Sequence, residues 1–131
     1  MTDPTELGRD VRCYASSYVR NRMHDSRFWL GQKLPVVLDL NGVAGTGVTV
    51  SSAKWEVILP YVAVMSNPRI LSDSRSVAVD ILANWIGDTT MKCAATLSDG
   101  SIITQLYRID ISGDPFNLPS QSTSGPTEVT V

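Results

Sequence analysis

From residue 34 onward, apolar residues alternate with polar ones in short runs, which is the pattern of half-buried β-strands. In Ser76–Ala83, for example, Val77, Val79 and Ile81 alternate with polar or small neighbours. The predicted strands are Leu34–Leu40, Val48–Leu59, Tyr61–Met65, Arg69–Leu71, Ser76–Ala83, Met91–Leu97 and Ser101–Ile111. Short strands at regular intervals with turn signals between them predict an all-β fold, an immunoglobulin-like β-sandwich.

Three local features refine this pattern. The inward-facing parity changes between Val50 and Ala53, which predicts a β-bulge at Ser51–Ser52. Ser66–Pro68 reads as a turn between two short strands. Ser98-Asp99-Gly100 predicts a tight hairpin, because Asp-Gly tolerates the positive backbone angles that such turns require, so the last two strands should pair.

The first 19 residues fit two structures. Asp3-Pro4-Thr5-Glu6 is a good helix start, and a helical stripe follows it. The stripe consists of Leu7, Val11, Tyr14 and Tyr18. Residues 11–20 also alternate as a strand would. We favour helix for residues 7–19 and keep strand as the alternative.

Residues 20–30 mix positive charge with large apolar groups, and nothing in their spacing buries Phe28 and Trp29 within a local element. These two side chains need a partner surface, either the sandwich that follows or another subunit. Arginine and aromatic residues are enriched in protein interfaces. The predicted partner-binding residues are Arg20, Arg22, Arg27, Phe28 and Trp29.

The chain therefore divides into three predicted parts. Residues 1–33 form an N-terminal attachment segment, residues 34–111 form the sandwich, and residues 112–131 form an extended tail rich in Ser, Gly and Pro. The strand-like Thr127–Val131 can add to a sheet edge of this molecule or of a neighbouring one. We expect the sandwich to fold without residues 1–33.

Composition agrees with a soluble globular domain: of 131 residues, 43% are hydrophobic and 18% are charged. No apolar run approaches the roughly 20 residues that span a bilayer, and the amino terminus lacks the features of a secretory signal. The net charge of −2 is uneven, because residues 1–33 carry six basic and four acidic residues. This excess is too small for a domain devoted to phosphate contacts, so we do not expect nucleic-acid binding.

The residues that carry chemistry do not converge. His24 is the only histidine, and because Asp25 and Ser26 follow it directly, the three side chains cannot align as a relay; a solvent-facing place in a polar linker is expected. The acidic residues are scattered without a metal-binding spacing, and the glycines of Gly42–Gly47 precede a strand rather than a phosphate-binding helix. A disulfide between Cys13 and Cys93 is not expected, and Cys93 is expected to be a buried thiol because it lies in a strand pattern. We therefore predict no catalytic, cofactor-binding or metal-binding residues, and no enzyme activity.

Several short motifs occur in an order typical of one family. They are Asp39-Leu-Asn-Gly, Val48-Thr-Val-Ser-Ser-Ala-Lys-Trp-Glu-Val, Ser76-Val-Ala-Val-Asp-Ile with a loop at Gly87, Cys93-Ala-Ala-Thr-Leu-Ser-Asp-Gly-Ser, and Tyr107-Arg-Ile-Asp-Ile. Over roughly residues 34–111 the chain resembles the small immunoglobulin-like structural proteins of tailed bacteriophages.

This resemblance implies a non-enzymatic virion structural protein, such as a tail, fibre-attachment or neck component, that docks through its N-terminal segment. It would be assembled in the host cytoplasm and found in the virion, with other virion proteins as partners, as a homo-oligomer in a ring or lattice. The alternatives are a capsid decoration protein, or a host- or carbohydrate-binding module that uses Tyr61 and Trp85 as stacking faces.

Overall fold

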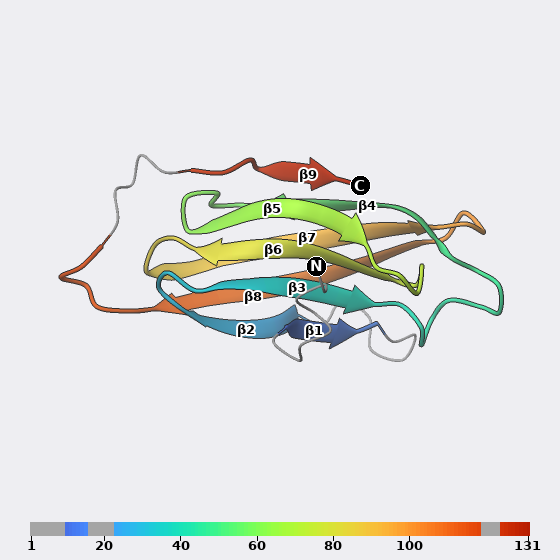
Figure 1. Ribbon diagram of the computed structural model, residues 1–131, viewed down its shortest axis with the longest axis horizontal. Helices are drawn as coiled ribbons and strands as arrows, with labels where there is room; N and C mark the ends of the chain where they lie inside the picture. Colours follow the sequence, from blue (N-terminus) through green and yellow to red (C-terminus); the bar gives the residue numbers. More distant parts are fainter. Residues whose placement is uncertain (1–9, 16–22, 119–123) are drawn as a thin grey trace.

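The computed structural model describes residues 10–15, 23–118 and 124–131, and within these ranges the chain forms nine strands and no helix. The strands are β1 (Val11–Tyr14), β2 (Met23–Trp29), β3 (Lys33–Asp39), β4 (Val50–Val57), β5 (Ala63–Ile70), β6 (Ser76–Ala83), β7 (Gly87–Leu97), β8 (Ile102–Ser112) and β9 (Glu128–Thr130). They form two stacked sheets (Figure 1). The predicted all-β sandwich is confirmed.

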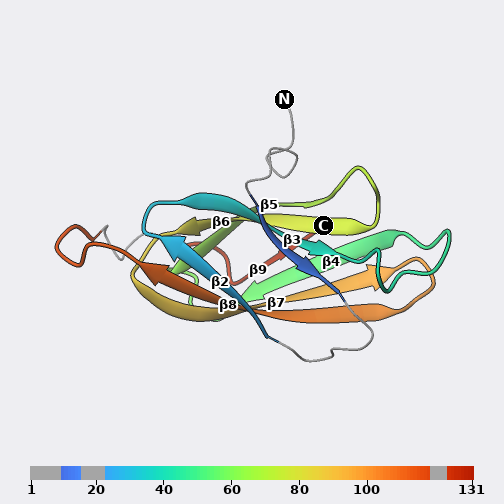
Figure 2. The same cartoon turned by 90° about the horizontal axis from the view of Figure 1, so that it is seen from below.

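One sheet has four strands in the order β1-β3-β6-β5, and the other has five in the order β2-β8-β7-β4-β9. The pairs β1–β3 and β2–β8 are parallel, and the remaining pairs are antiparallel. The first two strands are therefore outer strands, one in each sheet, and Figure 2 shows them on the same side of the molecule.

Large apolar side chains from both sheets fill the space between the layers. Trp55 and Tyr107 of the five-stranded sheet pack with their ring centroids 5.9 Å apart, and both are fully buried. The Tyr107 hydroxyl donates a 3.4 Å hydrogen bond to the Val37 carbonyl of the facing sheet. Burying a large apolar side chain stabilises a fold by about 1.5–3 kcal/mol, so this packing holds the two sheets together.

The N-terminal part of the chain differs from expectation. Val11–Tyr14 is strand β1, so the helix favoured for these residues is wrong and the strand alternative holds; residues 7–9 and 16–19 lie outside the described residues. The edge of β3 is available for pairing, and β1 pairs with it as a parallel strand. This pairing places Cys13 in the core, a burial that the local sequence pattern could not show. Because β2 pairs along its length with β8, the sandwich begins before residue 34.

Local features of the sheets follow the pattern with one exception. The register of β4 on β7 shifts between Val50 and Ser52, which confirms the predicted bulge, and β7 pairs with β8 as the hairpin signal predicted. The turn expected at Ser66–Pro68 is instead a bulge within β5, where Asn67 has a φ of 51° and the register breaks between Ser66 and Arg69. A bulge on an outer strand accommodates proline's missing N–H without ending the strand.

The tail returns to its own molecule. β9 pairs antiparallel with β4, and of the two possibilities left open for Thr127–Val131, the structure shows addition to a sheet edge of the same chain. Lys54 of β4 forms an ion pair of 3.3 Å with Glu128 of β9.

Candidate recognition surface

The side chains that most often act in catalysis, one histidine and two cysteines, lie in the core or against it. The His24 ring packs edge-on against Tyr107, with ring centroids 5.7 Å apart, so this histidine belongs to a strand and not to the expected polar linker. Cys13 and Cys93 are both free and buried, which confirms the burial predicted for Cys93. Burial raises the pKa of both thiols, and at Cys13 a hydrogen bond with Tyr107 acts in the opposite direction. Neither thiol is therefore poised as a nucleophile.

The described residues contain neither a metal-binding cluster nor a membrane-spanning helix. They contain no group of three or more His, Cys, Asp or Glu side chains that could hold a metal ion. None of their segments forms a helix long and apolar enough to cross a membrane.

Three connections meet at one end of the sandwich, at the right of Figure 1. They are the loop 40–49 between β3 and β4, the turn 71–75 between β5 and β6, and the hairpin 98–101 between β7 and β8. We call these three connections the loop end. Because they come from both sheets, the rigid core positions all three relative to one another.

Arg75 organises the longest of these connections. Its Nε donates to Asn41 Oδ1 at 2.7 Å, and its Nη2 donates to the Ala44 carbonyl at 2.7 Å. Its Nη1 donates to the carbonyls of Gly45 and Val48, each at 3.1 Å. The planar guanidinium presents its donors in a fixed fork. One side chain therefore holds the loop at several points along its length.

Two carboxylates, those of Asp39 and Asp73, accept hydrogen bonds from residues of this network. Asp39 Oδ1 accepts hydrogen bonds from the backbone and side-chain amides of Asn41, at 2.9 and 2.8 Å. Asp73 Oδ1 accepts the Arg75 N–H at 2.9 Å, and its Oδ2 accepts the Ser76 hydroxyl at 3.0 Å. Burial on its own would raise the pKa of Asp73, but the hydrogen bonds from Arg75, Ser76 and Asn41 outweigh it and lower the pKa below 3.8.

The hairpin 98–101 is joined to the same loop. The Ser98 N–H donates to the Thr49 carbonyl at 2.7 Å, and the Thr49 N–H donates to Ser98 Oγ at 3.1 Å. Asp99 Oδ1 accepts the Ser101 N–H at 2.9 Å, and a side-chain hydrogen bond with Ser101 lowers the pKa of Asp99. The loop end is thus a hydrogen-bonded unit rather than three independent loops.

The exposed groups of the loop end are small and mainly polar. Glycine, threonine, serine, asparagine and aspartate dominate it, and Ile102 at its margin is 65% exposed. Such residues supply backbone and short side-chain hydrogen bonds in recognition loops.

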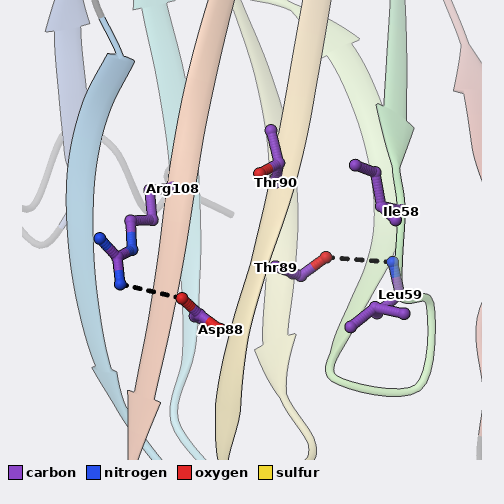
Figure 3. Close-up of a pocket in the computed structure, with 6 residues that line it drawn as sticks. All are labelled: Ile58, Leu59, Asp88, Thr89, Thr90 and Arg108. Atoms are coloured by element: carbon purple, nitrogen blue, oxygen red, sulfur yellow. Dashed lines mark hydrogen bonds and ion pairs between the residues drawn. The ribbon is translucent and has the colours of Figure 1, made fainter.

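A second feature is a shallow hollow on the outer face of the five-stranded sheet (Figure 3). Its volume is about 240 Å³, and it lies among Ile58, Leu59 and the strands β7 and β8. In it the Arg108 and Asp88 side chains point toward each other and form a 2.9 Å ion pair, and the Leu59 N–H donates to Thr89 Oγ1 at 3.0 Å. Both charged groups are more than half exposed, and the hollow is smaller than ordinary ligand pockets. It is not built to enclose a small molecule.

The structure separates the residues that the sequence grouped as partner-binding. Arg27 and Trp29 face outward from β2, whereas Phe28 points into the core and is 3% exposed. Of the two partner surfaces considered for this aromatic pair, the sandwich itself therefore buries Phe28. Arg20 and Arg22 lie outside the described residues. The sequence analysis missed Arg75, and its one local signal is the Asp73-Ser74-Arg75 turn.

No known protein-family model matches the chain, and no curated protein matches it. Among solved structures, the chain is similar to a cysteine protease inhibitor, EhICP2, from Entamoeba histolytica, at 14% identity and a TM-score of 0.46. The match covers 78% of this chain and 96% of that one. The solution structure of amebosin matches at 14% identity and a TM-score of 0.37, covering 78% of this chain and 98% of that one. Values this low supply no partner class for this chain.

The function expected from the resemblance is wrong. The two solved structures are a cysteine protease inhibitor and amebosin, neither of them a phage virion protein. The segment expected to dock on a neighbouring subunit contributes β1 and β2 to the sheets, and Phe28 is inside the core. The virion role, its capsid-decoration variant and the carbohydrate-binding alternative are therefore set aside.

Proposed function

We propose that this chain is a non-enzymatic recognition module that binds a protein partner through the loop end. The observation that carries the proposal is the Arg75 network, which spans the loop from Asn41 to Val48. Ordering a loop on binding costs free energy. A loop that is already ordered in the free protein therefore incurs a smaller free-energy cost when it binds. Recognition residues are also found most often on loops that a rigid scaffold positions.

The chemistry of the loop end favours a protein over a small ligand. Its exposed groups are distributed over three connections, and an extended protein surface can contact all three, whereas small ligands bind within one concave pocket. Ile102 adds an exposed apolar group at the margin, and protein interfaces combine such groups with a polar surround. The two thiols, by contrast, are buried in the core and offer no accessible nucleophile for catalysis.

Site-directed photo-cross-linking tests the proposal. A photoreactive side chain replaces exposed Thr46 in the loop end, and a control chain carries it at exposed Asn117. Asn117 follows the end of β8 that is opposite the loop end. Cross-linking is done in the cells that make the protein, and adducts are identified by mass spectrometry. We expect a defined protein adduct from position 46 and not from position 117.

The purified partner then gives the quantitative test. Arg75→Ala should weaken its binding by about tenfold or more, because the loop must be ordered at the moment of binding. The matched control is Arg108→Ala, which removes an exposed arginine from the face of Figure 3 and should bind as the wild type does. Equal adducts from both photoreactive positions, or equal loss with both arginine variants, would reject the loop end as the binding site.

A further inference from the structure

β2 presents an open backbone edge. It is the outer strand of the five-stranded sheet, and no strand within the described residues pairs with its second edge. The Leu30 N–H donates to the Ser112 carbonyl at 2.8 Å, whereas the N–H and C=O of Trp29 bind Gln32 at 3.1 and 2.9 Å. Successive residues of a strand direct their backbone groups to opposite sides, so the N–H and C=O groups of Asp25 and Arg27 point to the open edge.

The outward side chains of β2 have a symmetric order. They are Met23, Asp25, Arg27 and Trp29, so two opposite charges at the centre are flanked by two large apolar groups. Met23 is 40% exposed and Trp29 is 61% exposed. The midpoint of this series is Ser26, which faces the core.

We propose that two copies of this chain form a dimer by antiparallel pairing of β2 with β2 about a two-fold axis at Ser26. In this register Asp25 of each copy lies opposite Arg27 of the other, and Met23 lies opposite Trp29. The Asp25–Arg27 pairs are of the hydrogen-bonded kind, and each exchanges two backbone bonds. Opposite charges and a sulfur–aromatic contact across the strands add to this ladder.

Charge selects this register over its neighbours. An axis through Asp25 would place the two Asp25 carboxylates directly opposite each other, and an axis through Arg27 would do the same with two guanidinium groups. Like charges directly opposite in a sheet are destabilising. At both ends Gln32 occupies the backbone groups of Trp29, which limits the ladder to the central pairs.

A second observation falls on the proposed axis. Ser26 Oγ is buried and has no hydrogen-bond partner within the chain. Buried polar atoms without partners are rare and costly. In the proposed dimer the two Ser26 side chains form the non-hydrogen-bonded pair at the axis, where side chains are closest, and each hydroxyl gains the other as a partner.

Charge exchange tests the register. Arg27→Asp and Asp25→Arg each place like charges opposite one another in the homodimer, so each variant should raise the dimer dissociation constant by about tenfold or more. Mixed in equal amounts, the two variants restore both opposite-charge pairs and should form a heterodimer. The measurement is sedimentation equilibrium of the full chain over a range of concentrations.

The mixture also guards against variants that fail to fold, because only folded chains can restore the dimer. Lys92→Glu is the matched control: it changes a charge on the same face but on the inner strand β7, so it should leave the dissociation constant unchanged. Hydrogen exchange at the Asp25 and Arg27 amides should slow as protein concentration rises. A wild-type chain that stays monomeric at every concentration, or variants that do not associate when mixed, would overturn the proposal. The dimer does not depend on the function proposed for the loop end.

Discussion

Arg75 is the side chain on which the geometry of the loop 40–49 depends. Its acceptors are backbone carbonyls and one side-chain amide, 27 to 34 residues away along the chain. Backbone carbonyls are present whatever side chains the loop carries. The loop conformation therefore depends on a donor with the length and planar shape of arginine. The exposed ion pair of Arg108 with Asp88 makes no comparable demand.

Replacing Arg75 with lysine should therefore destabilise the fold locally and globally. A single ammonium cannot serve acceptors on several sides, so we expect a loss of about 1–3 kcal/mol in the free energy of unfolding. The amide protons of Val43, Ala44 and Val48 should exchange faster. Chemical denaturation and hydrogen exchange measure the two effects. Arg108→Lys should cost less than about 1 kcal/mol, and equal losses for both variants would contradict this role.

Asp73 should make stability depend on pH in the acid range. Its folded pKa is lowered by hydrogen bonds that overcome the effect of burial, so the unfolded carboxyl binds a proton more readily than the folded one. The contribution is fully present above the unfolded value and is lost as pH falls through the folded pKa. Denaturation curves recorded from pH 6 downward should show a shallower loss below about pH 4 for Asp73→Asn than for the wild type. Parallel curves would refute the assignment.

At the scale of elements, outer strands decide how the sheets end. β9 covers one edge of the five-stranded sheet, where Ala53 N–H donates to the Val131 carbonyl at 3.1 Å and Val57 N–H donates to the Thr127 carbonyl at 3.0 Å. Lys54 adds its ion pair with Glu128. An uncovered edge is a site for pairing with other chains. β9 therefore protects β4, and among the described strands β2 is the one in this sheet with an unpaired edge.

Removing residues 119–131 should expose this protected edge without unfolding the sandwich. The Ala53 and Val57 amides lose their acceptors and should exchange much faster, while the Ser98 amide, bonded to Thr49, should be unaffected. Amide hydrogen exchange resolved by NMR is the measurement. Unchanged protection at Ala53 would show that β9 does not pair with β4 in solution.

At the scale of the whole molecule, the N-terminal strands are part of one core. Phe28 of β2 and Cys13 of β1 are buried in it, and both strands cover edges of the strands they join. The expectation that the sandwich folds without residues 1–33 therefore conflicts with the packing.

Deleting residues 1–33 should abolish cooperative folding. Loss of a buried phenylalanine side chain costs about 3–5 kcal/mol by itself, out of a typical total of 5–15 kcal/mol, and the two lost strands add to it. A chain that begins at Asp10 retains every described strand and is the control. Thermal unfolding followed by circular dichroism compares the two, and a sharp transition in the shorter chain would show that β1 and β2 are dispensable.

The two proposals combine in a simple geometry. β2 runs parallel to β8, which starts at the hairpin of the loop end, so β2 runs away from that end. An antiparallel β2 pair would therefore direct the two loop ends of a dimer in opposite directions. Such a dimer is suited to hold two partner molecules at once, and multivalent attachment strengthens binding without new contacts.

The amino-acid pattern by itself predicted the sandwich and most of its strands between residues 34 and 111, although it wrongly divided β5 at Ser66–Pro68. Alternation at Val77, Val79 and Ile81, the parity change before Ala53 and the Asp99-Gly100 hairpin are signals between neighbours in the chain, so they can be read locally. The conclusion that Cys93 is a buried thiol rests on the same alternation within its strand.

Only the tertiary structure decided the fate of the N-terminal segment, the tail and the loop end. The sequence of Val11–Tyr14 fits either a helix or a strand, and pairing with β3 decides for the strand. Phe28 is buried because β2 pairs with β8, a contact that the local sequence does not show. Apart from the Asp73-Ser74-Arg75 turn, Arg75 shows no signal in its own neighbourhood, because its acceptors lie 27 to 34 residues away along the chain. Contacts between residues far apart in sequence carry no local periodicity, and they determine which groups the candidate surface presents.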